Sequence, residues 1–533
     1  MFNREQDLED KTRRPMVHNF FPIFHPTIAS MKKNVSLIIF SLIVAHLYAQ
    51  PSFIKDSLES YIKQGMKDWD IPGLSIVIVK DGQVVHMKGY GVKDIQTNAP
   101  VDENTLFMIA SNTKLFTGTA LANLEYRKKI SLNDKITKYF PDYKLYDKTT
   151  TELVTIRDLL AHRIGTKTFQ GDFTFWNSNL SRREIMYRMR LLKPVGLFRQ
   201  DYGYCNSCYL TAGEVIQKVT GQPWEVYVYD SLIIPAGMTN THALSQGITQ
   251  RKNVATPYTT SYTNKLNKVP YDQWDNLAPA ASIVSNVNDL SKWLMFQLDS
   301  GKVNGKQVIP WVVLQTTRDI NIVTNSRKSS NFPINIRGYG LGISSNDYNG
   351  KQLYSHTGGA AGMVSGVCFV PEEKLGIAIL TNNDNQGFFE ILRYQILDAY
   401  LGVPYINRSL QQLQSFKNDM QNQISEIEAW KARVKGNKPV LPLTAYTGEY
   451  NNELYGKLTI TAKDNKLFLK FHSHNNLTAT MQYMENDDWL LTYDNIEYGI
   501  FSTTFKIDKT KVTSVEIKAN EFVEKDPYTF IKK

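Results

Sequence analysis

Runs of β-branched and apolar residues stand at two places far apart in the chain, and they constrain the fold more than any other feature. An early run at 74–79 is followed by Asp81-Gly82 and a second run at 84–87. An Asp-Gly pair between two such runs predicts a β-hairpin. Further strands, and a helix after them, are expected at 351–355, 363–370, 375–380 and 387–401. The long stretch in between has helical and loop patterns, including a helix over about 111–127 with an apolar stripe. We therefore expect an α/β (α+β) fold whose sheet joins both ends of this region around a helical insert.

The pattern changes after this region. Residues 403–440 are polar and predict a linker with some helix, whereas short alternating strands with Gly, Asn and Asp turns follow from residue 441. Such regular short strands are typical of a small β-barrel or sandwich. A chain of 533 residues is also too long for one core. The expected divisions are an N-terminal extension with a signal peptide, an α/β domain, the linker and an all-β domain, at residues 1–49, 50–402, 403–440 and 441–533.

The clearest targeting signal lies near the N-terminus. Lys32 and Lys33 precede an apolar stretch at 35–44 that is too short to span a bilayer, and Ala49 offers a small residue for cleavage. This predicts a secretory signal peptide and a secreted or periplasmic mature protein. Met31 is then the expected natural start. Contact with a membrane is expected only through this segment, if it stays uncleaved.

The formal net charge of +10 raises the question of nucleic-acid binding. No run of Lys and Arg alternates with aromatic residues, so a solvated Lys-rich surface is expected and nucleic acid is not an expected partner. Such a surface is compatible with association with an anionic cell wall. No cofactor and no metal site are expected.

The chain has three cysteines, Cys205, Cys208 and Cys368, which cannot supply a disulfide framework. We expect them to be small buried hydrophobic residues, with a local Cys205–Cys208 disulfide as the alternative.

Ser111-Asn112-Thr113-Lys114 places a serine and a lysine three residues apart at the start of a predicted helix. This spacing puts hydroxyl and amine on one helical face. The amine can take up the serine proton if its pKa is depressed, and the helix N-terminus presents N–H groups to a developing oxyanion. The spacing alone is weak, since it recurs at Ser30, Ser52 and Ser60.

Tyr204-Cys205-Asn206 lies on a predicted loop before another helix. Residues i and i+2 of an extended segment face the same way, so the Tyr204 phenol and the Asn206 amide can enter one pocket. Tyr204 could act as a general base and later protonate a leaving group, while Asn206 could hold a substrate carbonyl. The same string is common by chance, and elsewhere a surface loop is the expected explanation.

His356-Thr357-Gly358-Gly359 occurs at the expected end of the strand 351–355. The Gly359 N–H could join the Ser111 N–H as a second oxyanion donor, and the small residues leave room for a substrate along the strand edge. Taken alone, the motif is also compatible with a strand that ends in a turn.

Together and in this order, the three motifs resemble the serine β-lactamase and penicillin-binding protein family, in particular its class C-like and D-aminopeptidase-like branch. The sequence segments that flank the motifs, at 107–110, 159–162, 279–282 and 288–290, also resemble this family. The resemblance covers about residues 55–400. It implies a β-lactamase/transpeptidase-like antiparallel sheet flanked by helices, with Ser111 as nucleophile, Lys114 and Tyr204 as proton carriers, and substrate contacts from Asn206, His356, Thr357, Gly358 and Gly359. The tail resembles the lipocalin-like β-domain that is often appended to such hydrolases.

One position departs from this resemblance. Class C β-lactamases have lysine where this chain has His356, and an imidazole with a pKa of about 6.5 is mostly neutral at pH 7. The hold on a β-lactam or D-Ala carboxylate is then weaker. The resemblance thus implies a serine hydrolase that acts through an acyl-enzyme on small amides or esters, such as D-amino-acid peptides or peptidoglycan-type peptides. The predicted signal peptide adds that this hydrolase is exported.

Two alternatives stay open at this point. One is a penicillin-binding sensor that is acylated with little turnover, and the other is a structural surface protein whose β-domain binds peptidoglycan or protein.

Overall fold

The computed structural model describes residues 50–533, and a nine-stranded antiparallel sheet organises the α/β domain within them. The predicted signal peptide and its cleavage site near Ala49 lie outside the described residues. The sheet order is β10-β11-β12-β13-β14-β15-β1-β2-β3. The strands are β1 Gly73–Lys80, β2 Gln83–Asp94, β3 Ala99–Pro100, β10 Ile322–Asn325, β11 Arg337–Tyr339, β12 Ser344–Tyr348, β13 Lys351–Ala360, β14 Met363–Val370 and β15 Leu375–Thr381.

The pairing of β1 with β15 joins the two ends of the domain. Leu74 pairs with Thr381 and Lys80 with Leu375, so the early hairpin and the late strands form one sheet, as the sequence predicted. The β1–β2 hairpin turns at Asp81-Gly82, where both residues have positive φ (52° and 75°). This is the conformation that a type I′ turn requires.

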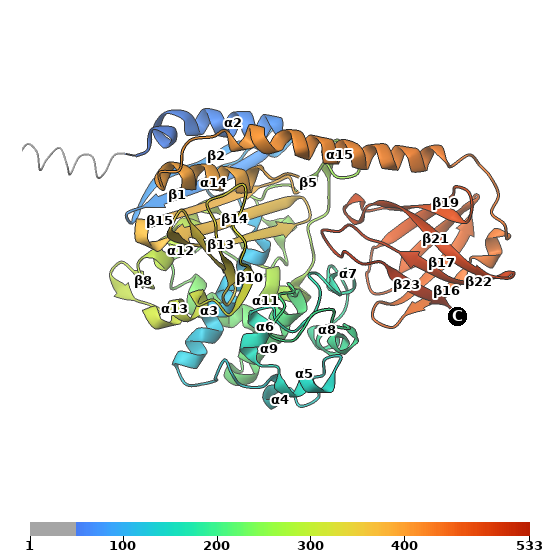
Figure 1. The fold of residues 1–533 in the computed structure, drawn as a ribbon, viewed down its shortest axis with the longest axis horizontal. Coiled ribbons are helices and arrows are strands. Elements are labelled where there is room, and N and C mark those ends of the chain that lie inside the picture. Colours follow the sequence, from blue (N-terminus) through green and yellow to red (C-terminus); the bar gives the residue numbers. More distant parts are fainter. Residues whose placement is uncertain (1–49) are drawn as a thin grey trace, which may run out of the picture. The chain divides into compact units, whose positions relative to one another are not determined.

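Helices cover both faces of the sheet (Figure 1). The helix α14 (Phe388–Tyr400) packs on β14 and β15 with α2 (Leu58–Asp68) beside it, whereas α12 (Val287–Leu298) packs on β1, β14 and β15. Because the sheet is covered on both sides, β1 is buried along nearly its whole length.

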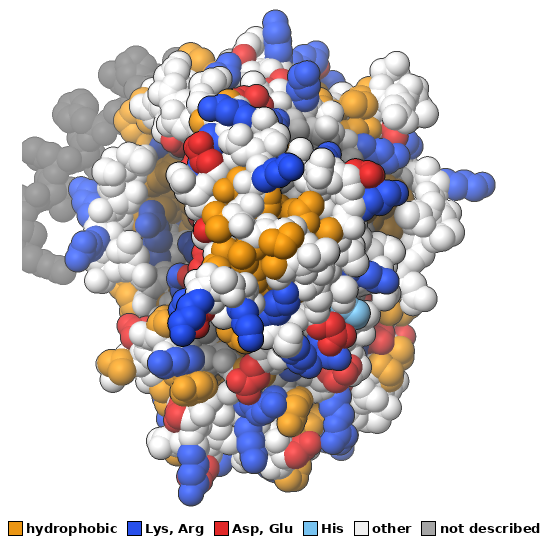
Figure 2. Space-filling view, turned by 90° about the vertical axis from the view of Figure 1, so that its right-hand side faces the viewer, with side chains coloured by type: hydrophobic (Ala, Val, Ile, Leu, Met, Phe, Trp, Pro, Cys, Tyr) orange, Lys and Arg blue, Asp and Glu red, His pale blue; other side chains and the backbone are white. Residues whose placement is uncertain are grey.

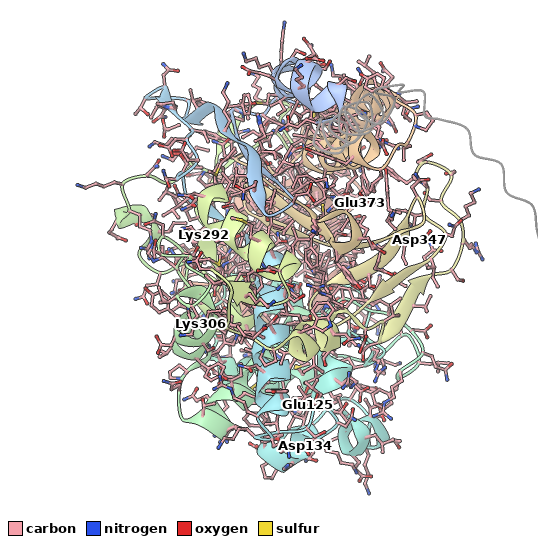
Figure 3. All side chains as sticks on the ribbon, turned by 90° about the vertical axis from the view of Figure 1, so that its left-hand side faces the viewer. Glu125, Asp134, Lys292, Lys306, Asp347 and Glu373 are labelled. Atoms are coloured by element: carbon pink, nitrogen blue, oxygen red, sulfur yellow. The ribbon has the colours of Figure 1, made fainter. Side chains whose placement is uncertain are left out.

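The helix α3 (Thr113–Tyr126) is the centre of the helical insert. Its residues from Thr113 to Leu124 are all buried, so the expected apolar stripe is instead a helix buried all round. The surrounding helices α9 (Asn206–Thr220), α11 (Ala278–Ala281) and α13 (Trp311–Arg318) contact it. Figure 3 shows α3 running toward Glu125 at its C-terminal end.

The remaining elements of the insert are short. They are α4 Ile136–Tyr139, α5 Lys148–Leu153, α6 Ile156–Leu160, α7 Asp172–Phe175, α8 Arg182–Arg188, α10 Trp224–Val228, the strand pairs β4 Phe107–Met108 with β7 Val284–Ser285, β5 Tyr258–Thr259 with β6 Asn267–Lys268, and β8 Lys302–Val303 with β9 Lys306–Gln307.

The C-terminal domain is a closed barrel of eight antiparallel strands within the described residues. Alternate residues of its strands are buried, and large aromatic side chains such as Trp489, Tyr455 and Phe505 fill the interior. The strands are β16 Gly448–Asn452, β17 Gly456–Lys463, β18 Lys466–Phe471, β19 Thr478–Tyr483, β20 Asp488–Tyr493, β21 Ile500–Asp508, β22 Lys511–Ile517 and β23 Tyr528–Lys532. Most of the predicted linker 403–440 is a single helix, α15 (Arg408–Ala432).

The described part of the chain can be compared with the expectations for membrane-spanning helices, surface charge and cysteines. No helix in residues 50–533 is both long enough and apolar enough to cross a membrane. On the face in Figure 2, Lys and Arg side chains are interspersed with Asp and Glu and do not form one basic patch. Cys205, Cys208 and Cys368 are buried free thiols, and the alternative Cys205–Cys208 disulfide is not formed.

We predict that Gly118→Ala destabilises the protein by roughly 1–3 kcal/mol, because overpacking outweighs the gain in helix propensity of about 1 kcal/mol. A Cβ at position 118 would lie 2.0 Å from the Leu341 carbonyl oxygen, and a backbone atom cannot give way easily. The measurement is the shift of the urea or thermal midpoint. Gly387→Ala is the control, because a Cβ at position 387 would lie 3.6 Å from its nearest neighbour and causes no overpacking. The loss of glycine at the N-cap of α14 should cost at most about 0.5–1 kcal/mol. Equal midpoints for the two variants would contradict the prediction.

Candidate active site

Ser111 lies in a short 3-10 helix, η2 (Ala110–Asn112), between the strand β4 and the helix α3. Ala110, just before it, has φ 48°, a left-handed conformation that costs energy for a residue with a side chain. Backbone N–H groups in the first turn of a helix lack intrahelical acceptors. The turn therefore presents both the Ser111 hydroxyl and its N–H to the cavity described below.

The Lys114 amine is held by three hydrogen bonds. Its Nζ lies 3.0 Å from Ser111 Oγ, 2.7 Å from Asn206 Oδ1 and 2.9 Å from the Ala280 carbonyl oxygen. Burial lowers the pKa of Lys114 to about 7, although nearby Asp172 acts in the opposite direction. The amide and carbonyl oxygens can only accept, so a neutral amine points its lone pair at the Ser111 hydroxyl. This is the geometry of a base that takes up the serine proton.

Asn206, the first residue of α9, is oriented by a buried carboxyl. Its Nδ2 donates to Asp172 Oδ2 over 2.6 Å, which turns its Oδ1 toward Lys114. Burial raises the pKa of Asp172 well above its usual range, and the neighbouring Glu524 raises it further. Asp172 therefore ionises less readily than an exposed carboxyl, which weakens its stabilisation of the Lys114 ammonium.

Tyr204 places its ring over Lys114, with Nζ 4.6 Å from the ring centroid. Burial raises the pKa of Tyr204 well above 10, while the Ser111 hydroxyl lowers it by less, so Tyr204 is a neutral phenol. His162 fixes this segment: its ring lies 4.3 Å from that of Tyr204, and its Nδ1 accepts from the Cys205 N–H over 3.0 Å. The neutral phenol is suited to donating a proton.

His356 lies inside a strand and not at its end. The strand β13 continues through Ala360, because residues 354–360 pair with 363–369 of β14. His356 Nδ1 lies 2.6 Å from the Thr357 carbonyl oxygen, so it carries the proton, and Nε2 accepts from the Tyr339 hydroxyl over 2.9 Å. Burial, together with the charge of Lys114, lowers the pKa of His356 to about 3. The imidazole is neutral, as the sequence suggested, and its nitrogens are already engaged.

The edge of β13 beyond His356 is open to a substrate. The neighbouring strand β12 pairs only as far as Ser344↔Ser355. The two-residue turn after Ala360 makes Ala360↔Met363 a hydrogen-bonded pair, so Gly359↔Val364 is a pair whose N–H and C=O point outward. The Gly359 N–H thus faces the open edge as an oxyanion donor.

Gly358 allows the strand to approach the nucleophile. A Cβ at this position would lie 2.1 Å from the Ile109 carbonyl oxygen and 3.0 Å from Ser111 N. Only glycine permits this contact without displacing the turn that carries Ser111.

These residues meet at a cavity of about 360 Å³ with no Asp, Glu, Lys or Arg in its lining. Six of its side chains are phenylalanine, tyrosine or tryptophan. The lining residues are Ser111, Thr168, Phe169, Trp176, Tyr202, Tyr204, Asn206, Tyr339, Ser344, His356, Thr357, Gly359 and Phe522. Every residue expected at the site lies in this lining except Lys114 and Gly358, which lie directly behind Ser111.

The sequence analysis did not identify four contributors: Asp172, His162 as an anchor of Tyr204, Tyr339 and Phe522. They come from separate segments and share no short motif, so only the tertiary structure brings them together. Across residues 50–533 there is no group of three or more His, Cys, Asp or Glu side chains that could hold a metal ion.

The sequence pattern of the Beta-lactamase family matches residues 58–401, which is more than half of the chain. The chain belongs to the Beta-lactamase family. Residues 432–531 of the chain match a second family pattern, described as a domain of unknown function (DUF3471).

Individual relatives agree with the family assignment. "Protein flp" of Staphylococcus aureus (strain MRSA252) is 29% identical to this chain over 338 residues. The matched region covers 62% of this chain and 64% of the relative's own length. "Unguisins hydrolase ungD" of Aspergillus violaceofuscus is 24% identical over 489 residues and covers 84% of this chain and 82% of its own.

The octameric penicillin-binding protein homologue from Pyrococcus abyssi shares the fold, with a TM-score of 0.57 and 22% identity over 89% of this chain and 99% of its own. The fold class expected from the sequence is confirmed.

We predict that the reactivity of Ser111 rises with pH through an inflection near 7. Only the neutral Lys114 amine can accept the serine proton, and the fraction of neutral amine grows as pH passes its pKa of about 7. The measurement is the rate of Ser111 modification by a neutral organophosphonate between pH 5 and 9, followed by intact mass. Lys114→Met should remove the inflection and slow the reaction by about 10²–10⁴-fold. A rate that does not change between pH 6 and 8 would contradict the assignment.

Proposed function

We propose that this protein is an exported serine hydrolase that forms an acyl-enzyme on Ser111 and acts on small uncharged esters or amides, including D-amino-acid peptide derivatives. The observation that carries the proposal is the 3.0 Å contact between Lys114 Nζ and Ser111 Oγ at the edge of an uncharged cavity. The name of the relative ungD, a hydrolase, gives independent support for turnover on this scaffold.

Acylation follows from the arrangement. Lys114 takes the proton of Ser111 as Oγ attacks the substrate carbonyl carbon, and the N–H groups of Ser111 and Gly359 stabilise the oxyanion. The bond to the leaving group then breaks, and the leaving atom takes a proton from the neutral Tyr204 phenol, which regains one from the Lys114 ammonium.

Deacylation repeats these steps with water. Water attacks the acyl carbon, its proton passes to the Tyr204–Lys114 pair, and Oγ of Ser111 leaves with a proton. Asn206 holds the lysine in place during both steps through its 2.7 Å contact.

The lining of the cavity favours uncharged substrates. A carboxylate bound there would meet a neutral His356 and aromatic rings and would find no cation in the lining. A buried charge without a partner is costly. Small neutral esters and amides are thus better suited to the cavity than β-lactams or peptides that end in a free carboxylate.

We predict that Ser111→Ala lowers kcat/KM for a chromogenic acetate ester by at least about 10³-fold, because removal of a nucleophile leaves only binding and the oxyanion donors. Ser60→Ala is the matched control: Ser60 begins another Ser-x-x-Lys string and is exposed, and its hydroxyl donates to the Ser57 carbonyl oxygen in the described structure. We expect its activity to equal that of the wild type. A single stoichiometric burst from the wild type would instead identify a sensor that is acylated without turnover, and hydrolysis by Ser111→Ala at the wild-type rate would refute the assignment of the nucleophile.

We further predict that N-acetyl-D-alanyl-D-alanine amide is hydrolysed at least about tenfold more efficiently than N-acetyl-D-alanyl-D-alanine. The two differ only in the terminal carboxylate, and an unsatisfied buried charge costs about 1–3 kcal/mol or more. The measurement is kcat/KM for both substrates at one pH and ionic strength. Equal values, or a preference for the carboxylate, would show that a cation outside the cavity lining recognises the substrate.

A further inference from the structure

The loop between β22 and β23 of the barrel reaches the catalytic cavity. Its Phe522 lines the cavity together with Ser111, although the two residues belong to different domains. A Cβ built on Gly359 would lie 2.2 Å from the tip of the Phe522 ring. The ring therefore occupies the space beside the oxyanion donor that a side chain at position 359 would otherwise fill.

The loop is held on both sides of Phe522. On one side, the Asn520 side chain donates to the Glu497 carbonyl oxygen over 3.0 Å and accepts from the Phe522 N–H over 3.1 Å. On the other, the buried Glu524 carboxyl accepts from the Gly171 N–H over 2.7 Å, and Asp526 forms an ion pair with Lys167. Two of these anchors are on the catalytic domain, so the position of the ring is fixed relative to the cavity.

Phe522 and Tyr204 have different aromatic neighbours around the cavity. The Tyr204 ring contacts Phe169 and lies 6.2 Å from His356, whereas Phe522 contacts Trp176, with ring centroids also 6.2 Å apart. In the proposed function the leaving group departs toward Tyr204, which protonates it. The group on the other side of the carbonyl, the acyl group, then faces Phe522 and Trp176.

We propose that Phe522 is a specificity-determining residue that the barrel supplies to the catalytic domain, and that its ring limits the size of the acyl group beside Gly359. This inference rests on the proposed function for the identity of the acyl group. It gives the barrel a part in substrate selection and not only in holding the domain together.

The test compares two p-nitrophenyl esters that differ only in the acyl group, acetate and a bulky diphenylacetate. In Phe522→Ala the ratio of kcat/KM for the bulky ester to that for acetate should rise at least about tenfold, which is the lower end of what a pocket contact discriminates. Phe522→Leu, which keeps an apolar side chain of shorter reach, should give an intermediate ratio and decides the question if the alanine variant does not fold. Phe468→Ala is the matched control, since Phe468 lies on β18 of the same barrel with 37% of its surface exposed.

A second measurement separates this inference from the proposed function. Ketone analogues of the two esters, which cannot be hydrolysed, are titrated by calorimetry into Ser111→Ala and Ser111→Ala/Phe522→Ala. A rise in relative affinity for the bulky ketone in the double variant supports the size limit set by Phe522, even if the wild type hydrolyses neither ester. Failure of the wild type to hydrolyse either ester would contradict only the proposed function. An unchanged kcat/KM ratio in both Phe522 variants, with wild-type turnover intact, or an unchanged relative affinity overturns the inference and leaves the loop as a structural anchor alone.

Discussion

The rest of this structure depends on the hydrogen bonds of the buried Lys114 amine. Its three partners come from η2, α9 and α11. Asn206 and Ala280 lie 92 and 166 residues after Lys114 in the chain, yet both contact its Nζ atom. A fully buried ammonium is costly, and these partners offer it only neutral oxygens. The amine is therefore neutral for part of the time near pH 7. The packing that positions the helical insert also lowers the pKa of this lysine to about 7.

The neutral surroundings of the amine extend to His356. Its two nitrogens have different roles, since Nδ1–H donates to the Thr357 carbonyl oxygen and Nε2 accepts from the Tyr339 hydroxyl. A lysine has no acceptor and could not receive the bond from Tyr339. It would also place a second cation near Lys114, where like charges oppose each other. Histidine at this position thus gives the cavity a neutral wall where a lysine would place a cation.

Local patterns predicted the parts of the molecule that local interactions determine. The Asp81-Gly82 hairpin, the strands and the spacing of Ser111 and Lys114 each depend on residues close in sequence. The end of β13 was predicted wrongly, because its glycines indicated a turn, whereas pairing with β14 keeps them in the sheet. Asp172 and Phe522 could not be predicted, since each acquires its place from segments that lie far away in the chain. The order of the motifs predicted a nucleophile and its base, and the structure places Lys114 Nζ 3.0 Å from Ser111 Oγ. The residues that surround this pair come from distant segments of the chain.

Glu524 connects the barrel to this base. Its carboxyl is buried, and burial raises its pKa to about 8, so it is largely protonated at neutral pH while it accepts the Gly171 N–H. It also lies close enough to Asp172 to raise the pKa of that carboxyl. The charge of an ionised Asp172 raises the pKa of Lys114, so an Asp172 carboxyl that ionises less readily favours the neutral amine. The raised pKa values of both carboxyls therefore have two effects: they lower the cost of burying the barrel loop against the catalytic domain, and they favour the neutral form of the Lys114 amine.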